Sequence, residues 1–486
     1  MAFTLSPPQL PPALMRPALP TPVVQPQLLA LNAALATQLG LDTAALASFA
    51  GVAVLAGNAP ADGSEPVALA YAGHQFASFV PQLGDGRAIL LGEAGSDGAG
   101  RFDVQLKGAG RTPFSRGGDG RAALGPVLRE YVLSEAMAAL GVPTTRALAA
   151  VATGEPVFRS EVLPGAVLTR VAASHLRIGT FQFFAVRQDH KTVAQLTELA
   201  LRRHYPAADR SAGDALTLLD QVITAQASLV AQWMGFGFVH GVMNTDNTAI
   251  SGETLDYGPC AFLDGFDPLR TFSSIDHGGR YAYANQPQIA LWNLARLAEC
   301  LVPLVDADKE RAVDRLVEHL SQFTARFDAA YEAVFRRKLG LGAAQPGDRA
   351  LIDGLLAVLA AERVDFTVFF RGLAEHVGDS EPMALEHLFN DPGPLQAWWQ
   401  LWQARLQVDG RSRNVQRALC RAASPAFIAR NHQVERMIAA ANAGDLGPFD
   451  RLNRVLSRPF DDQDDALDLA VAPLDEQWAY KTFCGT

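Results

Sequence analysis

Residues 240–258 read His-Gly-Val-Met-Asn-Thr-Asp-Asn-Thr-Ala-Ile-Ser-Gly-Glu-Thr-Leu-Asp-Tyr-Gly. Within this stretch Asn247 and Asp256 lie nine residues apart, a separation at which two oxygen ligands can converge on one hard cation such as Mg²⁺. Mn²⁺ accepts the same ligands. Asp246 stands directly beside Asn247, where a carboxylate could orient and deprotonate a hydroxyl nucleophile. The alternative interpretation is a pair of Asx turns around a hairpin.

A glycine-rich tetrapeptide precedes this stretch. Residues 84–87 are Gly-Asp-Gly-Arg, and apolar runs flank them within residues 71–94. That pattern predicts a strand–turn–strand unit. Gly84 and Gly86 would let backbone N–H groups approach phosphate oxygens closely, although a plain hairpin turn explains them equally. A second glycine-rich stretch, residues 108–120, contains too much glycine to form a regular element.

Two charged residues lie between the glycine-rich tetrapeptide and residue 240. Residues 101–107 alternate polar and apolar side chains, which predicts a strand that ends at Lys107. A helix is expected from Pro126 to Leu140, with Gly141 as its C-terminal cap. Glu130 lies on a mostly apolar side of that helix, so it needs a partner if it is buried, and Lys107 is the natural candidate. A solvated lysine and an exposed glutamate are the simpler alternatives.

These features follow the order of the protein-kinase signature set: glycine-rich turn, strand lysine, helix glutamate, histidine-containing loop and Asp-x-Gly. The kinase catalytic loop reads His-Arg-Asp-x-x-x-x-Asn. His240 and Asn247 keep that seven-residue offset, but Gly241 and Val242 replace the arginine and the catalytic aspartate. A protein without that base should transfer a γ-phosphoryl group poorly.

The chain is expected to be α+β, because strand patterns come first and helical patterns follow without regular alternation. We expect a kinase-like fold with a β-rich N-lobe at 61–187, which binds the nucleotide, and a helical C-lobe at 188–486. Residues 1–60 should form a proline-rich arm, extended to about residue 27, and a helical extension from 28 to 58. Residues 144–187 look β-rich, and residues 214–233 and 313–334 show helical periodicity.

Composition excludes several classes of protein. The chain has 486 residues, 49% of them hydrophobic, and a formal net charge of −10, so it should be globular and should not bind nucleic acid. Its four cysteines form no C-x-x-C pair, which argues against a zinc site and a disulfide framework. We find neither a secretory signal nor an apolar run long enough to span a membrane, and we expect a cytoplasmic monomer.

Several longer motifs resemble the selenoprotein O family of pseudokinases. They are Gly-Asp-Gly-Arg at 84–87, Gln-Leu-Lys-Gly-Ala-Gly-Arg-Thr-Pro-Phe-Ser-Arg at 105–116, Gly-Asp-Gly-Arg at 118–121, the stretch 240–247 and Asp-Tyr-Gly-Pro at 256–259. The similarity runs from about Tyr71 to the C-terminus. It implies a pseudokinase fold that holds ATP in a flipped orientation and transfers AMP to serine, threonine or tyrosine hydroxyls of proteins.

The resemblance also implies residue roles. ATP contacts are implied for Gly84, Gly86, Arg87, Lys107, Asp119, Gly120, Arg170, Arg177 and Asp256. Glu130 would orient Lys107, Asn247 and Asp256 would bind Mg²⁺ or Mn²⁺, and Asp246 would accept the proton. Cys484 occupies the position of selenocysteine in animal members and is a candidate redox residue. The family's second cysteine is replaced within Thr271-Phe272-Ser273-Ser274, and Cys260 is the nearest substitute at a different spacing.

Other functions stay open at this point. The chain could be a γ-phosphoryl kinase, which the valine at position 242 disfavours. It could bind ATP without turnover as a scaffold, or act as a redox protein through Cys484. Transfer of UMP from UTP is a further alternative, because no base-reading residue can be identified. The protein substrates are not specified by the sequence.

Overall fold

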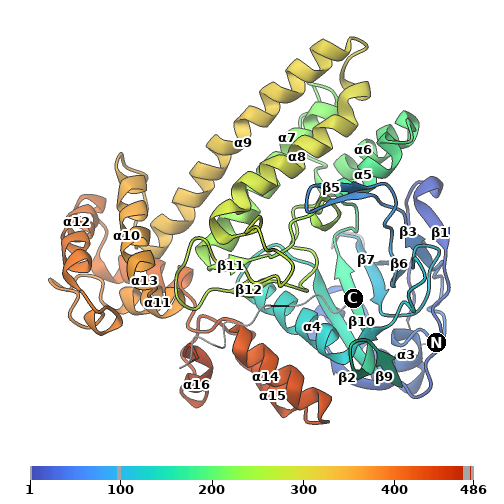
Figure 1. The fold of residues 1–486 in the computed structure, drawn as a ribbon, viewed down its shortest axis with the longest axis horizontal. Helices are drawn as coiled ribbons and strands as arrows, with labels where there is room; N and C mark the ends of the chain where they lie inside the picture. The colour runs from blue at the N-terminus through green and yellow to red at the C-terminus, as the bar shows by residue number, and fades with distance from the viewer. Residues whose placement is uncertain (1–2, 96–99, 474–481, 483–486) are drawn as a thin grey trace.

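The computed structural model describes residues 3–95, 100–473 and 482. One antiparallel sheet contains eight strands, ordered β1-β3-β6-β7-β10-β9-β2, with β8 paired to β10. Helices dominate the chain after this sheet (Figure 1). This is the α+β order that the sequence predicts. The strands are β1 Met15–Pro17, β2 Gln27–Leu31, β3 Val67–Leu69, β6 Ala88–Ala94, β7 Phe102–Lys107, β8 Ala122–Ala123, β9 Arg146–Phe158 and β10 Val162–Ala172.

Strand β7 lies near the middle of the sheet and ends at a functional candidate. The expected strand at 101–107 is confirmed to within one residue. Lys107, its last residue, is paired with Ala88 of β6 on one side and with Leu168 of β10 on the other. The sheet therefore fixes the backbone of Lys107 from both sides.

The strand–turn–strand prediction for residues 71–94 is wrong about its turn. A separate two-stranded hairpin, β4 (Gly73–Gln75) and β5 (Ser78–Val80), turns at Phe76 and Ala77. Both turn residues have positive φ, +50° and +67°. Neither phenylalanine nor alanine favours this conformation, so no residue type in the sequence marks the turn. Residues 84–86 lie instead in an irregular segment that leads into β6.

The N-terminal residues are part of the main sheet. Strand β1 pairs with β3, and Leu5 and Leu14 are buried, so residues 3–27 of the expected proline-rich arm pack onto the body of the protein. Residues 28–31 belong to β2, which corrects the helix expected there. The remainder of that helical prediction is confirmed by α1 (Ala33–Gln38), α2 (Thr43–Ala47) and α3 (Phe49–Leu55). Each begins at a side-chain N-cap, namely Asn32, Asp42 and Ser48.

Two helices border the sheet near the expected site. Helix α4 (Leu124–Ala139) begins two residues before the expected Pro126 and carries Glu130. Helix α5 (Ile178–Ala185) lies inside the stretch 144–187 that was expected to be β-rich. Its residues include three phenylalanines and an isoleucine, which favour a strand by local propensity, so tertiary packing overrides propensity there.

The later half of the chain is helical, as expected. The helices predicted over 214–233 and 313–334 are confirmed as α7 (Asp214–Gly235) and α9 (Lys309–Lys338). The others are α6 His190–His204, α8 Gln286–Val305, α10 Asp348–Glu362, α11 Phe366–Glu375, α12 Gly393–Asp409, α13 Arg413–Ala423, α14 Asn431–Asn442, α15 Gly447–Leu456 and α16 Leu467–Ala470. Short strands β11 (Phe238–Val239) and β12 (Ala261–Phe262) pair on either side of the stretch 240–258.

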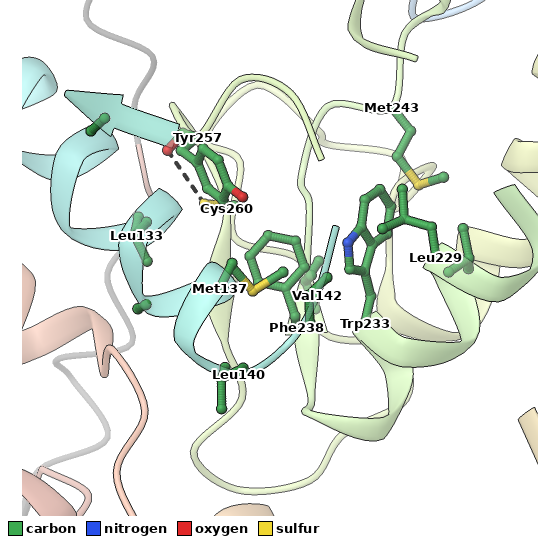
Figure 2. Packing of buried hydrophobic residues seen from close by; sticks show 14 of the residues in the cluster. Leu133, Met137, Leu140, Val142, Leu229, Trp233, Phe238, Met243, Tyr257 and Cys260 are labelled. Atoms are coloured by element: carbon green, nitrogen blue, oxygen red, sulfur yellow. Dashed lines mark hydrogen bonds between the residues drawn. The ribbon is translucent and has the colours of Figure 1, made fainter. Parts of the chain in front are cut away.

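A hydrophobic contact region joins α4 to the stretch 240–258. Figure 2 shows Met137 of α4 facing Phe238, with Trp233 of α7 on the other side of that ring. The Phe238 ring lies 5.7 Å from Trp233 and 6.3 Å from Tyr257, centroid to centroid. Since all these side chains are buried, this packing holds the helix that carries Glu130 beside the segment that carries Asp256.

One segment, Tyr283–Val305, is long and apolar enough to cross a membrane by length and composition. No such segment was expected from the sequence. Helix α8 forms most of it and packs against α5, α7 and α9 (Figure 1). The residues that it buries there, which include Leu294, Leu297 and Leu301, account for part of its apolar composition.

Candidate nucleotide-binding site

A cavity of about 760 Å³ brings together nearly all the residues singled out in the sequence. Glu130 lies behind its wall, in contact with Lys107. Cys484 lies outside the described residues. The predicted residues that line the cavity are Gly84, Gly86, Arg87, Lys107, Asp119, Gly120, Arg170, Arg177, Asp246, Asn247 and Asp256.

Glu130 binds two cations at once. Its Oε2 accepts a hydrogen bond from Lys107 Nζ at 2.5 Å, and its Oε1 lies 2.6 Å from Arg170 Nη2 and 2.7 Å from Nε. Burial disfavours the Glu130 carboxylate, but Arg170 and Lys107 outweigh that effect and lower its pKa. The sequence predicted the Lys107 contact. It did not predict Arg170 as a second partner, because that residue lies 40 positions away on β10.

Asp256 faces this cluster from the opposite side. Its Oδ1 lies 3.3 Å from Lys107 Nζ, and its backbone has a φ of +72°. A non-glycine residue with positive φ is uncommon, and such strain is concentrated at functional sites. Burial disfavours the carboxylate, yet Lys107 and Arg170 hold the pKa of Asp256 well below its usual range. Asp256 is therefore an anion at neutral pH.

The loop after β11 presents Asn247 and Asp246. His240 is buried, and its Nε2 lies 3.0 Å from the Leu255 carbonyl oxygen, which ties the loop to the residue before Asp256. The Asn247 Nδ2 donates to the Val242 carbonyl at 3.1 Å. That bond turns the amide oxygen, a potential cation ligand, to the other side of the group. Asp246 and Asn247 line the same cavity as Asp256.

Asp246 is almost completely buried. Its Oδ1 atom has no hydrogen-bond partner among the described residues, whereas its backbone carbonyl accepts a bond from Arg177 Nη1 at 3.1 Å. Burial raises the pKa of Asp246 to about 6. A carboxyl group with such a pKa is well suited to accept a proton near neutral pH.

A buried polar chain through Asp85 and Gln105 connects Arg177 to Arg170, and the sequence assigned no role to those two linking residues. Arg177 lies 3.5 Å from Asp85 Oδ1, and its guanidinium carbon is 4.3 Å from the Tyr71 ring centroid. Asp85 Oδ2 accepts from Gln105 Nε2 at 3.1 Å, and Gln105 Oε1 accepts from Arg170 Nη1 at 3.4 Å. Asp85 lies in the motif at 84–87 and Gln105 in the motif at 105–116. Their place in these motifs was the sign in the sequence that they could belong to the site.

The glycine-rich stretch 108–120 closes over residues 84–87. Thr112 Oγ1 donates to the Asp85 carbonyl at 2.6 Å, and Ser115 Oγ donates to the Gly86 carbonyl at 2.5 Å. A Cβ at Gly84, whose φ is +71°, would lie 2.2 Å from the Phe114 ring, so this approach requires glycine. Asp119 lies at the cavity rim, half-exposed and bound to Arg159 at 2.8 Å.

The donor set fits a small hard cation. Asn247 and Asp256 offer an amide oxygen and a carboxylate, and Asp246 adds a buried oxygen without a partner. Mg²⁺ normally takes one or two protein carboxylates and completes its coordination with waters and substrate phosphates. No group of three or more His, Cys, Asp or Glu side chains among the described residues forms a dedicated metal cage. A cation here would therefore share its ligands with a phosphate-bearing substrate.

Cationic side chains and carboxylate and amide oxygens line one cavity, an arrangement suited to a phosphate-bearing substrate. Comparison with known proteins gives the family. A family model described as "Protein adenylyltransferase SelO" matches residues 11–457, and the chain belongs to this family. The chain is 53% identical over 468 residues to the protein nucleotidyltransferase YdiU of Bradyrhizobium sp. strain ORS 278, covering 96% of this chain and 95% of the relative. It is 55% identical over 476 residues to the YdiU of Methylorubrum populi, with the same coverage.

Proposed function

We propose that this chain is a metal-dependent protein adenylyltransferase with a kinase-like fold. It transfers AMP from ATP to serine, threonine or tyrosine hydroxyls of proteins and releases pyrophosphate. The observation that carries the proposal is the single cavity in which Lys107, Arg170 and Arg177 face Asp246 and Asp256. The family description and the names of the relatives, protein nucleotidyltransferases, support the same class of reaction.

The cations of the cavity bind the triphosphate and stabilise the departing pyrophosphate. Arg170 and Arg177 are buried, and ion pairs and backbone contacts hold them in place, so they need little rearrangement when negative charge develops. Lys107 is held in the same way between Glu130 and Asp256. A bound Mg²⁺ or Mn²⁺ would neutralise phosphate charge at Asn247 and Asp256.

Asp246 acts as the proton acceptor. The hydroxyl oxygen of the target forms a bond to the α-phosphorus, the bond from that phosphorus to the pyrophosphate oxygen breaks, and the hydroxyl proton passes to Asp246. The pyrophosphate leaves with the bonding electron pair. Val242 replaces the kinase catalytic aspartate and lines the cavity, so no carboxylate stands at the position used for γ-phosphoryl transfer.

Labelled nucleotides test the proposal. Incubation with acceptor proteins should transfer label from α-labelled ATP and none from γ-labelled ATP, and Asp246→Asn should abolish the transfer. Label retained only from γ-labelled ATP would mean that the chain is a kinase. The same assay with α-labelled UTP decides the choice of base, since stronger incorporation from UTP would make the chain a uridylyltransferase.

A further inference from the structure

The β4–β5 hairpin lies directly against the loop that carries Asp246. The His74 backbone N–H donates to Thr245 Oγ1 at 2.7 Å, and the Phe76 N–H donates to Asn244 Oδ1 at 3.0 Å. One N–H group belongs to β4 and the other to the turn that follows it, and both point to the loop that carries Asp246. Between them, the Gln75 side chain lies close enough to the Asp246 carboxyl to lower its pKa. His74 and Phe76 thus bind residues 245 and 244 through their backbone, and Gln75 stands between them beside Asp246.

Two further elements secure this contact. Thr245 Oγ1 donates to Gln182 Oε1 at 2.7 Å, and Gln182 Nε2 lies 2.8 Å from His74 Nδ1, so α5 bonds both the loop and the hairpin. The Tyr281 hydroxyl donates to Asn244 Oδ1 at 2.6 Å. Its ring meets Phe76 edge-on, with 5.1 Å between the ring centroids. The hairpin and the loop are therefore one hydrogen-bonded unit.

Gly73 determines where the Asp246 carboxylate can lie. A Cβ at position 73 would be 2.4 Å from Asp246 Oδ1 and 2.9 Å from its Cγ, closer than real Cβ atoms come. The other atom at such short range is a methyl carbon of Leu83, at 2.9 Å. Since these are side-chain atoms and not backbone, an added methyl group would displace the carboxylate without requiring the fold to change.

The turn of the hairpin is itself unusual. Phe76 and Ala77 both have positive φ, in a two-residue turn where Asn-Gly is the favoured sequence. Phe76 and Gln75 also line the cavity. A strained turn that keeps a large side chain beside a catalytic candidate is typical of a segment retained for function.

From these contacts we infer that the β4–β5 hairpin positions the catalytic carboxylate, and that Gly73 and Gln75 are positioning residues for AMP transfer. The inference rests on the proposed role of Asp246. Gly73 leaves the space in which the carboxylate lies, Gln75 lies beside that carboxylate, and the backbone of His74 and Phe76 holds the loop. Neither residue acts on the nucleotide's phosphates through a charge.

The test compares Gly73→Ala with Gly372→Ala. A Cβ at Gly372, in α11, would meet Leu385 Cδ2 at 2.6 Å, a similar close contact far along the chain. With α-labelled ATP and a fixed protein acceptor, Gly73→Ala should lower kcat on the order of 100-fold, as expected for an ångström-scale misplacement of a catalytic group. The apparent KM for ATP should stay at the wild-type value. Gly372→Ala should change neither quantity.

A second pair of variants guards against misfolding of Gly73→Ala. Gln75→Leu removes the amide beside Asp246 and should lower kcat with KM for ATP unchanged. Ser78→Ala, at the exposed position that pairs with Gln75 across the hairpin, should behave as wild type. Equal activity of Gln75→Leu and Ser78→Ala, or a rise in KM without a fall in kcat, would overturn the inference.

The Asp246→Asn background separates this inference from the proposed function. If Asp246→Asn retains transfer, the assigned role of Asp246 is wrong. If Asp246→Asn is inactive while Gly73→Ala and Gln75→Leu keep wild-type kcat, only the hairpin inference fails.

Discussion

Replacing Glu130 with glutamine tests the buried charge cluster behind the cavity. The substitution keeps the size of the side chain and removes its charge. In the wild-type protein the carboxylate accepts bonds from Lys107 Nζ at 2.5 Å and from Arg170 Nε at 2.7 Å. In the Glu130→Gln variant, Lys107 would keep its ion pair with Asp256 at 3.3 Å. Of its direct hydrogen bonds, Arg170 would keep the long one to Gln105. The main loss therefore falls on Arg170, a buried cation that would have no carboxylate in direct contact and would keep only a longer-range interaction with Asp256.

The size of the effect follows from that burial. Removing one partner of a buried ion pair costs about 3–5 kcal/mol, since the remaining charge is left uncompensated. Glutamine retains an acceptor oxygen for one of the two cations. We therefore expect the free energy of unfolding to fall by about 3 kcal/mol, the lower end of this range. Activity should also fall, because Lys107 loses the contact that holds it beside the phosphates.

Urea denaturation followed by tryptophan fluorescence measures the stability change. Glu435→Gln is the matched control, because Glu435 is partly exposed and pairs with Arg129 at 3.1 Å. Arg129 keeps bonds to the Gly258 carbonyl and Asn431, so this variant should lose less than about 1 kcal/mol. Equal denaturation midpoints for Glu130→Gln and Glu435→Gln would refute the reasoning.

Three other outcomes are expected. Asp256→Ala should eliminate nucleotidyl transfer while circular dichroism shows an intact fold, and normal activity would rule out the assigned role of Asp256. Burial lowers the pKa of Lys338 to about 7. Because the unfolded lysine keeps its proton to a higher pH, the free energy of unfolding should rise as the pH increases above 7. The urea midpoint of the wild-type chain should therefore increase over that pH range, and the midpoint of Lys338→Met should not show this increase. Cys484→Ser should keep transferase activity in the labelled-ATP assay, whereas loss of activity would favour the redox alternative.

The parts of the fold that the sequence predicts well are those in which neighbouring residues suffice. The periodic apolar residues of α9 and the alternation before Lys107 each specify one element by themselves. A carboxylate on an apolar helix face demands a cation, which is why the Lys107–Glu130 contact could be expected. Its second partner, Arg170, comes from a strand whose register only the assembled sheet sets.

The wrong predictions concern segments whose structure depends on contacts with residues far away in the sequence. Residues 28–31 form β2 because β9 offers them an edge, although their composition suits a helix. The tight turn at Phe76 and Ala77 carries none of the residue types that favour turns, and the hydrogen bonds of His74 and Phe76 to residues 245 and 244 stabilise it. Gly73 gives no signal as a site residue either, because its importance depends on a carboxylate more than 170 positions away.

The α-phosphorus as the point of attack is the central claim, and the mass of a modified protein tests it most directly. After incubation of an acceptor protein with ATP, the divalent cation and this chain, the intact mass should increase by one AMP unit for each modified hydroxyl. Asp246→Asn should give no increase. An increase by a single phosphate with the wild-type chain would contradict the account.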